Sequence, residues 1–290
     1  MNKMRHRVVV AILAFLATGS GFCDAERQTR EASEDIFFIE NDCNTTEKFA
    51  MVIHGWKESC STEWVIDTIS NLTLHRGGCI ICMDYSKYSI DDYFNGLVPK
   101  FPLVVEAILG KLEELEVRGF DPANGYLFGF SFGAQSSIEA GRRFGFRRIG
   151  RIDVCDPAGP GFDGDRVFSS LDPKCAAKNV QCIHTSNDKG TFVRECSQNW
   201  NMGNCGTNQP AAGQYPKGSH GLCPYFYNSA FVNEFRAVDK PKECFSFRAV
   251  APIPEGFRMG YFSEMDRGLI GDYFSRTTSA YPYNELPDND

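Results

Sequence analysis

A serine between two glycines carries the clearest chemical signal in this sequence. Gly129-Phe130-Ser131-Phe132-Gly133 follows an apolar stretch, residues 126–128, and precedes a stretch of helical composition, residues 134–140. A serine in a sharp turn between a strand and a helix exposes its hydroxyl at the carboxyl edge of a sheet, and flanking glycines keep other side chains out of the turn. Ser131 is therefore a candidate nucleophile. The alternative is an ordinary Gly-Ser turn at the surface.

A serine hydroxyl needs a base to act as a nucleophile near neutral pH. Only two histidines follow Ser131 in the chain, His184 and His220. His184 ends an apolar stretch, residues 179–183, where a packed and hydrogen-bonded histidine is expected. His220 lies in a glycine-containing loop, residues 217–221. A base delivered from a loop above the sheet fits His220 better than His184.

The third group of such a site is a carboxylate at a strand end. Asp156 ends the apolar residues 149–155, and a proline follows it and stops the strand. A buried carboxylate at this point can hold the tautomer of the imidazole and stabilise the imidazolium. Asp153 is the competing candidate, and its alternative role is a salt bridge with Arg148 or Arg151.

Backbone N–H groups must also face the developing negative charge. Residues 52–56, which include His54-Gly55-Trp56, predict a strand that runs into a glycine turn. We expect the backbone N–H groups of Trp56 and Phe132 to form the oxyanion hole.

The elements that would position these residues alternate between strands and helices. A chain of this pattern is expected to fold as an α/β protein with a mostly parallel central sheet and helices on both faces. Phe/Tyr-rich pieces after about residue 240, at residues 244–250 and 273–276, are expected to add antiparallel strands at a sheet edge. The expected strands are residues 49–53, 79–83, 125–128, 148–155 and 179–183, and the expected helices are residues 64–74, 102–117 and 134–144.

Composition favours a globular domain and argues against a nucleic-acid partner. Hydrophobic residues make up 42% of the 290 residues and charged residues 23%, which is close to ordinary globular usage. The net charge is −7, from 30 Lys and Arg against 37 Asp and Glu, and a large phosphate interface needs clustered cations. We expect residues 26–290 to form one domain.

The first 25 residues predict a secretory signal peptide. Lys3, Arg5 and Arg7 precede an apolar stretch, residues 8–16, and then the small residues 17–21. The apolar stretch is too short to span a bilayer. The expected location of the mature protein is extracellular.

Cysteines and glycosylation sequons agree with export. The chain has 12 cysteines without zinc-type spacing, since Cys79 and Cys82 form one CxxC-like pair with no second pair. Disulfides are the expected state of cysteines in an exported protein. Asn44 and Asn71 each begin an N-glycosylation sequon.

Four motifs together carry a family resemblance. His54-Gly55-Trp56, residues 129–133, Asp156-Pro157-Ala158-Gly159-Pro160 and Ser219-His220-Gly221 resemble in order and spacing the pancreatic-lipase family of α/β-hydrolases, especially its short insect members. The resemblance runs from about residue 37 to residue 283. It implies the α/β-hydrolase fold and hydrolysis of carboxylic esters of acyl lipids through an acyl-serine intermediate. It carries the catalytic roles over to Ser131, Asp156 and His220.

The sequence also departs from the family in ways that matter for partners. No second, β-sandwich domain is expected, so colipase is not an expected partner. The lid that many members carry before the catalytic histidine is short here, residues 196–220, as in phospholipase A1-like members with more open sites. Trp200 and Met202 would then either touch lipid or be incidental exposed apolar groups.

Neither a cofactor nor a metal is expected. Some relatives bind calcium near the acid; here Asp172 remains, but Val167 and Cys175 stand where carboxylates would be needed. The lipid class stays open between phospholipid cleaved at the sn-1 position and neutral glycerolipid. The alternative function is a non-catalytic lipase-fold protein for lipid binding or yolk-like storage.

Overall fold

The structure is a computed structural model that describes residues 35–41, 43, 47–164, 172–246, 252–265 and 268–285. The expected signal peptide, residues 1–25, and the sequon residue Asn44 lie outside these ranges.

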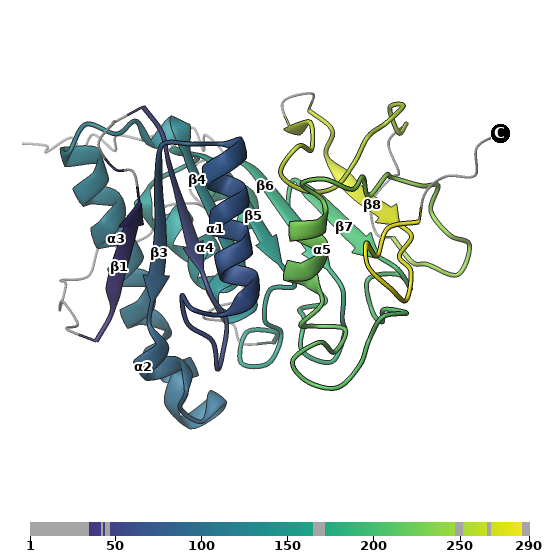
Figure 1. Cartoon of the computed structure of the whole chain (residues 1–290), viewed down its shortest axis with the longest axis horizontal. Helices are drawn as coiled ribbons and strands as arrows, with labels where there is room; N and C mark the ends of the chain where they lie inside the picture. Colours follow the sequence, from purple (N-terminus) through teal and green to yellow (C-terminus); the bar gives the residue numbers. More distant parts are fainter. Residues whose placement is uncertain are drawn as a thin grey trace, which may run out of the picture.

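One twisted sheet of eight strands organises the described residues (Figure 1). Its order is β1-β3-β2-β4-β5-β6-β7-β8, and only β1 runs antiparallel to its neighbour. β2, β3 and β4 are buried along their whole length, as expected for parallel strands covered on both faces. The strands are β1 (Phe37–Asn41), β2 (Phe49–Ile53), β3 (Cys79–Asp84), β4 (Gly125–Phe130), β5 (Ile149–Cys155), β6 (Ala177–His184), β7 (Gln198–Met202) and β8 (Gly271–Ser275).

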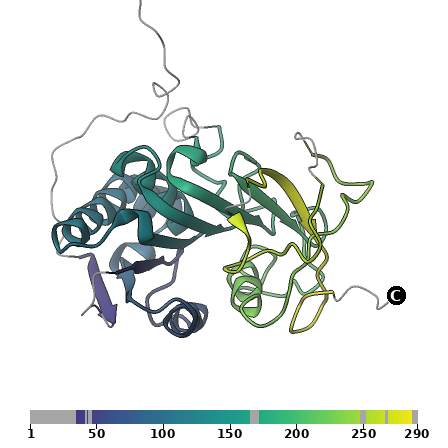
Figure 2. The same ribbon diagram turned by 90° about the horizontal axis from the view of Figure 1, so that it is seen from above.

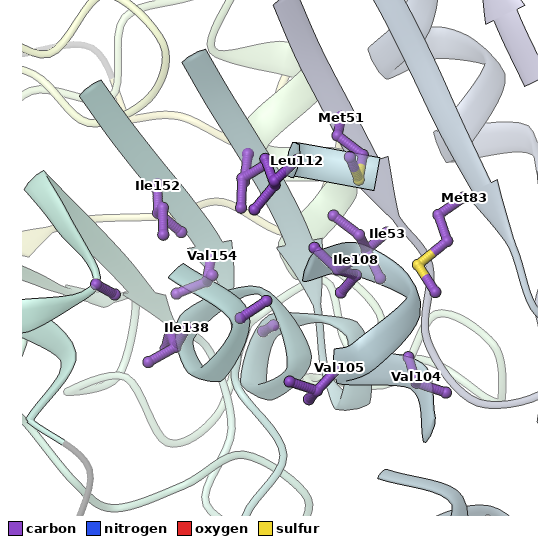
Figure 3. Close-up of a cluster of buried hydrophobic side chains, with 14 of the residues drawn as sticks. Met51, Ile53, Met83, Val104, Val105, Ile108, Leu112, Ile138, Ile152 and Val154 are labelled. Atoms are coloured by element: carbon purple, nitrogen blue, oxygen red, sulfur yellow. The ribbon is translucent and has the colours of Figure 1, made fainter. Parts of the chain in front are cut away.

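Helices cover both faces of the sheet (Figure 2). α3 and α4 pack on one face, where Val105, Ile108 and Leu112 of α3 meet Ile53 and Ile152 of the strands (Figure 3). α1 and α5 cover the other face through a second cluster rich in aromatic side chains. The helices are α1 (Glu63–His75), α2 (Ser86–Ser89), α3 (Phe101–Val117), α4 (Phe132–Phe144) and α5 (Cys223–Ser229).

The α/β-hydrolase fold expected from the sequence is confirmed by this arrangement, a mostly parallel sheet with helices on both faces. Two details of the expectation are wrong. β8 pairs in parallel with β7, so the antiparallel edge strand is β1 at the opposite edge. Trp200 and Met202 do not belong to an exposed lid, because both are fully buried in β7. Of the expected strand at residues 244–250, only 244–246 are described, and they form no strand.

Disulfides join distant parts of the described chain, as the sequence predicts. Cys79 and Cys82 bond to different partners, Cys43 and Cys60, rather than to each other. The remaining bridges are Cys155–Cys223, Cys182–Cys196 and Cys205–Cys244, and Cys175 is also disulfide-bonded. Within the described ranges, no helix combines the length and the apolar character needed to cross a membrane.

Candidate active site

Ser131 occupies the sharp turn between β4 and α4. Its backbone has φ 56°, a conformation that side-chain-bearing residues rarely adopt and that concentrates at functional sites. The turn packs directly against the end of β2, since a Cβ on Gly133 would lie 2.3 Å from the backbone oxygen of His54. Glycine at position 133 is therefore what allows the two motifs to meet.

Three side chains from distant parts of the chain form one hydrogen-bonded relay. His220 Nε2 lies 2.8 Å from Ser131 Oγ, and His220 Nδ1 lies 2.7 Å from Asp156 Oδ2. The carboxylate only accepts, so Nδ1 carries the proton that it donates to Asp156. Nε2 is then free to accept the hydroxyl proton of Ser131, which is the arrangement that nucleophilic attack requires.

Asp156 is fully buried and is held by donors from the end of β6. Its Oδ1 accepts the backbone N–H groups of Thr185 at 2.8 Å and Ser186 at 3.2 Å, and its Oδ2 accepts the Ser186 hydroxyl at 2.5 Å. These donors hold the buried carboxylate in place and leave Oδ2 able to accept from His220 Nδ1. The carboxylate can therefore balance an imidazolium at His220.

The two competing candidates lie elsewhere. Asp153 is buried in an ion pair with Arg151 and accepts the hydroxyls of Tyr126 and Tyr227, each at 2.8 Å. His184 is fully buried at the end of β6, where its Nε2 lies 3.4 Å from Asn199 Oδ1 and burial keeps its pKa well below the usual value. Neither side chain contacts Ser131 or His220 among the described residues.

The expected oxyanion donors flank the nucleophile from two sides. Phe132 begins α4 directly after Ser131, and Trp56 lies in the turn after β2. Within the described part of the chain, neither backbone N–H donates a hydrogen bond. His54 fixes the start of this turn: its Nδ1 donates to the Gly55 carbonyl at 2.9 Å, and its ring stacks on Tyr85 at 4.1 Å.

A cavity of 760 Å³ opens above the relay. Ser131 and His220 lie in its wall together with aromatic side chains that include Phe94, which is 60% exposed. A cavity of this size, with aromatic rings beside polar and charged groups, can hold an amphiphilic ligand. A second cavity of 780 Å³, around Arg76 and Arg151, contains no histidine in its wall. The first cavity, above the relay, is also lined by Trp56, Glu58, Tyr93, Phe130, Tyr215 and Pro216.

Two other sequence predictions concern residues outside the relay. Asn71 lies within α1, partly buried, with its Nδ2 3.4 Å from Asn228 Oδ1. In the described ranges, the residues that approach metal-binding geometry are Glu40, Cys43 and Cys79, and the two cysteines are bonded to each other. Asp172 instead caps a short helical turn by accepting the backbone N–H of Lys174.

The sequence analysis did not identify Thr185 and Ser186, which hydrogen-bond Asp156, or Glu58, which hydrogen-bonds the turn that contains Trp56. Asp156 directly follows β5, and His184 ends the neighbouring parallel strand β6. The residues that follow His184 could therefore have been expected near Asp156, which was the available signal for Thr185 and Ser186. Glu58 follows the His54-Gly55-Trp56 motif by two residues, and its type alone gives no sign of its contacts.

The sequence pattern that defines the lipase family matches residues 14–207, more than half of the chain. The chain belongs to the lipase family. The matched span includes Ser131 and Asp156 but stops before His220.

The relatives of this lipase-family chain are distant. It is 23% identical to mouse lipase member H over 82% of its own length and 56% of the relative. It is 33% identical to human pancreatic triacylglycerol lipase over 49% of its length and 30% of the relative. The chain thus spans about half or less of the length of the curated relatives it matches. An esterase from Pyrococcus furiosus shares 16% identity with a TM-score of 0.41, over 66% of this chain and 80% of that one.

Proposed function

We propose that this member of the lipase family is a secreted serine hydrolase that cleaves carboxylic esters of acyl lipids. The observation that carries the proposal is the relay Ser131–His220–Asp156, with both links at hydrogen-bond distance, in the wall of an aromatic-lined cavity. Family membership supports an ester as the substrate. The disulfides among the described residues support an oxidising compartment.

The reaction follows from the positions of the donors and acceptors. His220 Nε2 takes the proton of the Ser131 hydroxyl as Oγ attacks the ester carbonyl, and Asp156 stabilises the imidazolium that forms. The N–H groups of Trp56 and Phe132 stabilise the oxyanion of the tetrahedral intermediate. His220 then protonates the leaving alcohol, and water hydrolyses the acyl-serine with His220 again as the base.

The proposed substrates are phospholipid cleaved at the sn-1 position, as by a phospholipase A1-like enzyme, and neutral glycerolipid. The cavity wall combines apolar rings with Asp92, Asp188 and Lys189, so a polar headgroup and an acyl chain can both be accommodated. A hydrolysis screen across phospholipid vesicles, triacylglycerol emulsions and galactolipid vesicles separates these substrates.

Fluorophosphonate labelling of the purified protein tests the proposal directly. An activated serine reacts with the phosphonate, and we expect labelling of the native protein but not of the Ser131→Ala variant. Labelling that survives Ser131→Ala would contradict the assignment. Absence of labelling and of hydrolysis would instead favour the non-catalytic lipid-binding or storage alternative.

A further inference from the structure

Glu58 accepts a hydrogen bond from the turn that carries the proposed oxyanion donor. Its Oε2 accepts the backbone N–H of Gly55 at 2.7 Å, and its Oε1 accepts the indole N–H of Trp64 in α1 at 2.8 Å. Lys57, between Trp56 and Glu58, has φ 60°, so the chain reverses and the carboxylate folds back onto the turn. Through these contacts the carboxylate joins the turn to α1.

The contact pattern selects a carboxylate at this position. Two N–H donors from different elements each meet one oxygen, and both oxygens are needed as acceptors. A glutamine has a single acceptor oxygen, and its amide N–H₂ would face one of the two N–H donors. A donor left unpaired in a partly buried site is unfavourable.

Glu58 is also coupled to the base through packed groups. A Cβ on Gly55 would lie 3.0 Å from both Glu58 Oε2 and Phe130 Cδ1, so the turn is held between these two side chains. The ring of Phe130 in turn packs on the ring of His220, with centroids 4.8 Å apart. Glu58 and His220 line the same cavity.

Several titratable groups face Glu58 from the elements around it. The charge of His220 favours ionised Glu58, and the negative charge of Glu58 contributes to the raised pKa of Tyr85, Tyr215 and Tyr225. Among the described residues Glu58 forms no salt bridge. Burial raises the pKa of Glu58 to about 6, against the opposing effects of Trp64 and Gly55, so the group changes charge close to neutral pH.

We propose that Glu58 is a positioning residue for the ester hydrolysis assigned to Ser131. Its carboxylate fixes the turn that carries the Trp56 N–H, and its negative charge favours the imidazolium that His220 becomes during attack. This inference rests on the proposed function. As the pH falls through the range in which Glu58 gains a proton, its negative charge is lost, and with it the support for the turn and for the imidazolium.

The test compares Glu58→Gln with Glu63→Gln in the full-length protein, with a soluble short-chain ester as the substrate. Glu63 begins α1, and its side chain is 68% exposed, so the control removes the same charge from the same region. We expect Glu58→Gln to lower kcat roughly 10- to 100-fold, the scale of a misplaced oxyanion donor, with KM changed less than about twofold. Wild-type kcat in Glu58→Gln would overturn the inference.

The pH profile separates positioning from a purely structural role. From about pH 5 to about pH 9, the acidic limb of kcat should be less steep in Glu58→Gln than in the wild type, because the variant lacks the titration of Glu58. Trp64→Phe provides a second reading if Glu58→Gln does not fold. Loss of the indole N–H removes a donor to the charged carboxylate, so the acidic limb should move to higher pH; an unmoved limb would overturn the inference.

The same assays distinguish this inference from the proposed function. If Ser131→Ala retains the hydrolysis of the wild type, the proposed function fails whatever Glu58 does. If hydrolysis depends on Ser131 while Glu58→Gln matches Glu63→Gln in kcat and pH profile, only the role of Glu58 fails.

Discussion

Cys155 and Cys223 form a disulfide beside the hydrogen bond between Asp156 and His220. Cys155 ends β5 directly before Asp156, and Cys223 begins α5 three residues after His220. The bridge therefore joins the segment that carries the proposed acid to the segment that carries the proposed base. The disulfide therefore limits how far Asp156 and His220 can move apart.

We expect loss of this disulfide to reduce activity more than its contribution to stability explains. Cys155→Ala/Cys223→Ala opens a loop of 68 residues and Cys43→Ala/Cys79→Ala one of 36. Chain entropy gives both a similar stabilisation, about 4 kcal/mol. Below the unfolding temperature of both variants, kcat should fall roughly tenfold in the first and stay near wild type in the second.

Urea unfolding and short-chain ester hydrolysis, measured on the same preparations, check this prediction. Equal kcat values in the two double variants would show that the bridge beside Asp156 stabilises the fold without positioning the relay.

Substitution of Asp153 should lower stability, and substitution of Asp156 should lower activity. Asp153→Asn leaves Arg151 buried without its charge partner, which should cost about 3–5 kcal/mol in the free energy of unfolding. Activity per folded molecule should stay close to wild type. Asp156→Asn should lower kcat by about 10⁴, because the amide no longer holds the imidazole tautomer.

Chemical denaturation and active-site titration with a fluorophosphonate measure the two effects separately. A large loss of kcat in folded Asp153→Asn would contradict the prediction and make Asp153 a candidate for the catalytic carboxylate.

The sequence predicted those elements whose burial pattern is local. β2 and β3 are apolar throughout, and α3 repeats apolar residues at helical spacing, so their positions agree with expectation to within one or two residues. β7 was missed because its sequence, Gln198–Met202, is mostly polar. Its Asn199 is buried through a hydrogen bond to Asp272 at 3.0 Å on β8, a partner 73 residues away that no local pattern reveals.

The candidate site was predictable to a similar degree. Ser131 and Asp156 were predicted from their positions at strand ends and His220 from its position in a loop, because strand ends of a parallel sheet meet at one edge. The contacts of Ser186 with Asp156, and of Glu58 with Gly55, depend on how loops pack above that edge. Those contacts are set by tertiary structure alone.

His54 makes the stability of the fold depend on pH. The ring is fully buried, and burial lowers its pKa from 6.5 to about 4. Below pH 6.5 the unfolded chain binds a proton at this histidine, whereas the folded chain does not until about pH 4. Above pH 6.5 the titration of His54 does not reduce the free energy of unfolding. As the pH falls from 6.5 toward 4, this titration lowers the free energy of unfolding by about 3 kcal/mol in total.

Urea unfolding of the wild type, His54→Asn and His75→Asn across this pH range isolates the effect. His54→Asn should be less stable at neutral pH, since it loses the stacking on Tyr85, but its free energy of unfolding should fall less steeply in acid. His75→Asn removes an exposed imidazole and is the control for the loss of a histidine as such. Parallel curves for wild type and His54→Asn would mean that His54 already binds its proton in the folded state, and that the turn carrying Trp56 tolerates a charged imidazole.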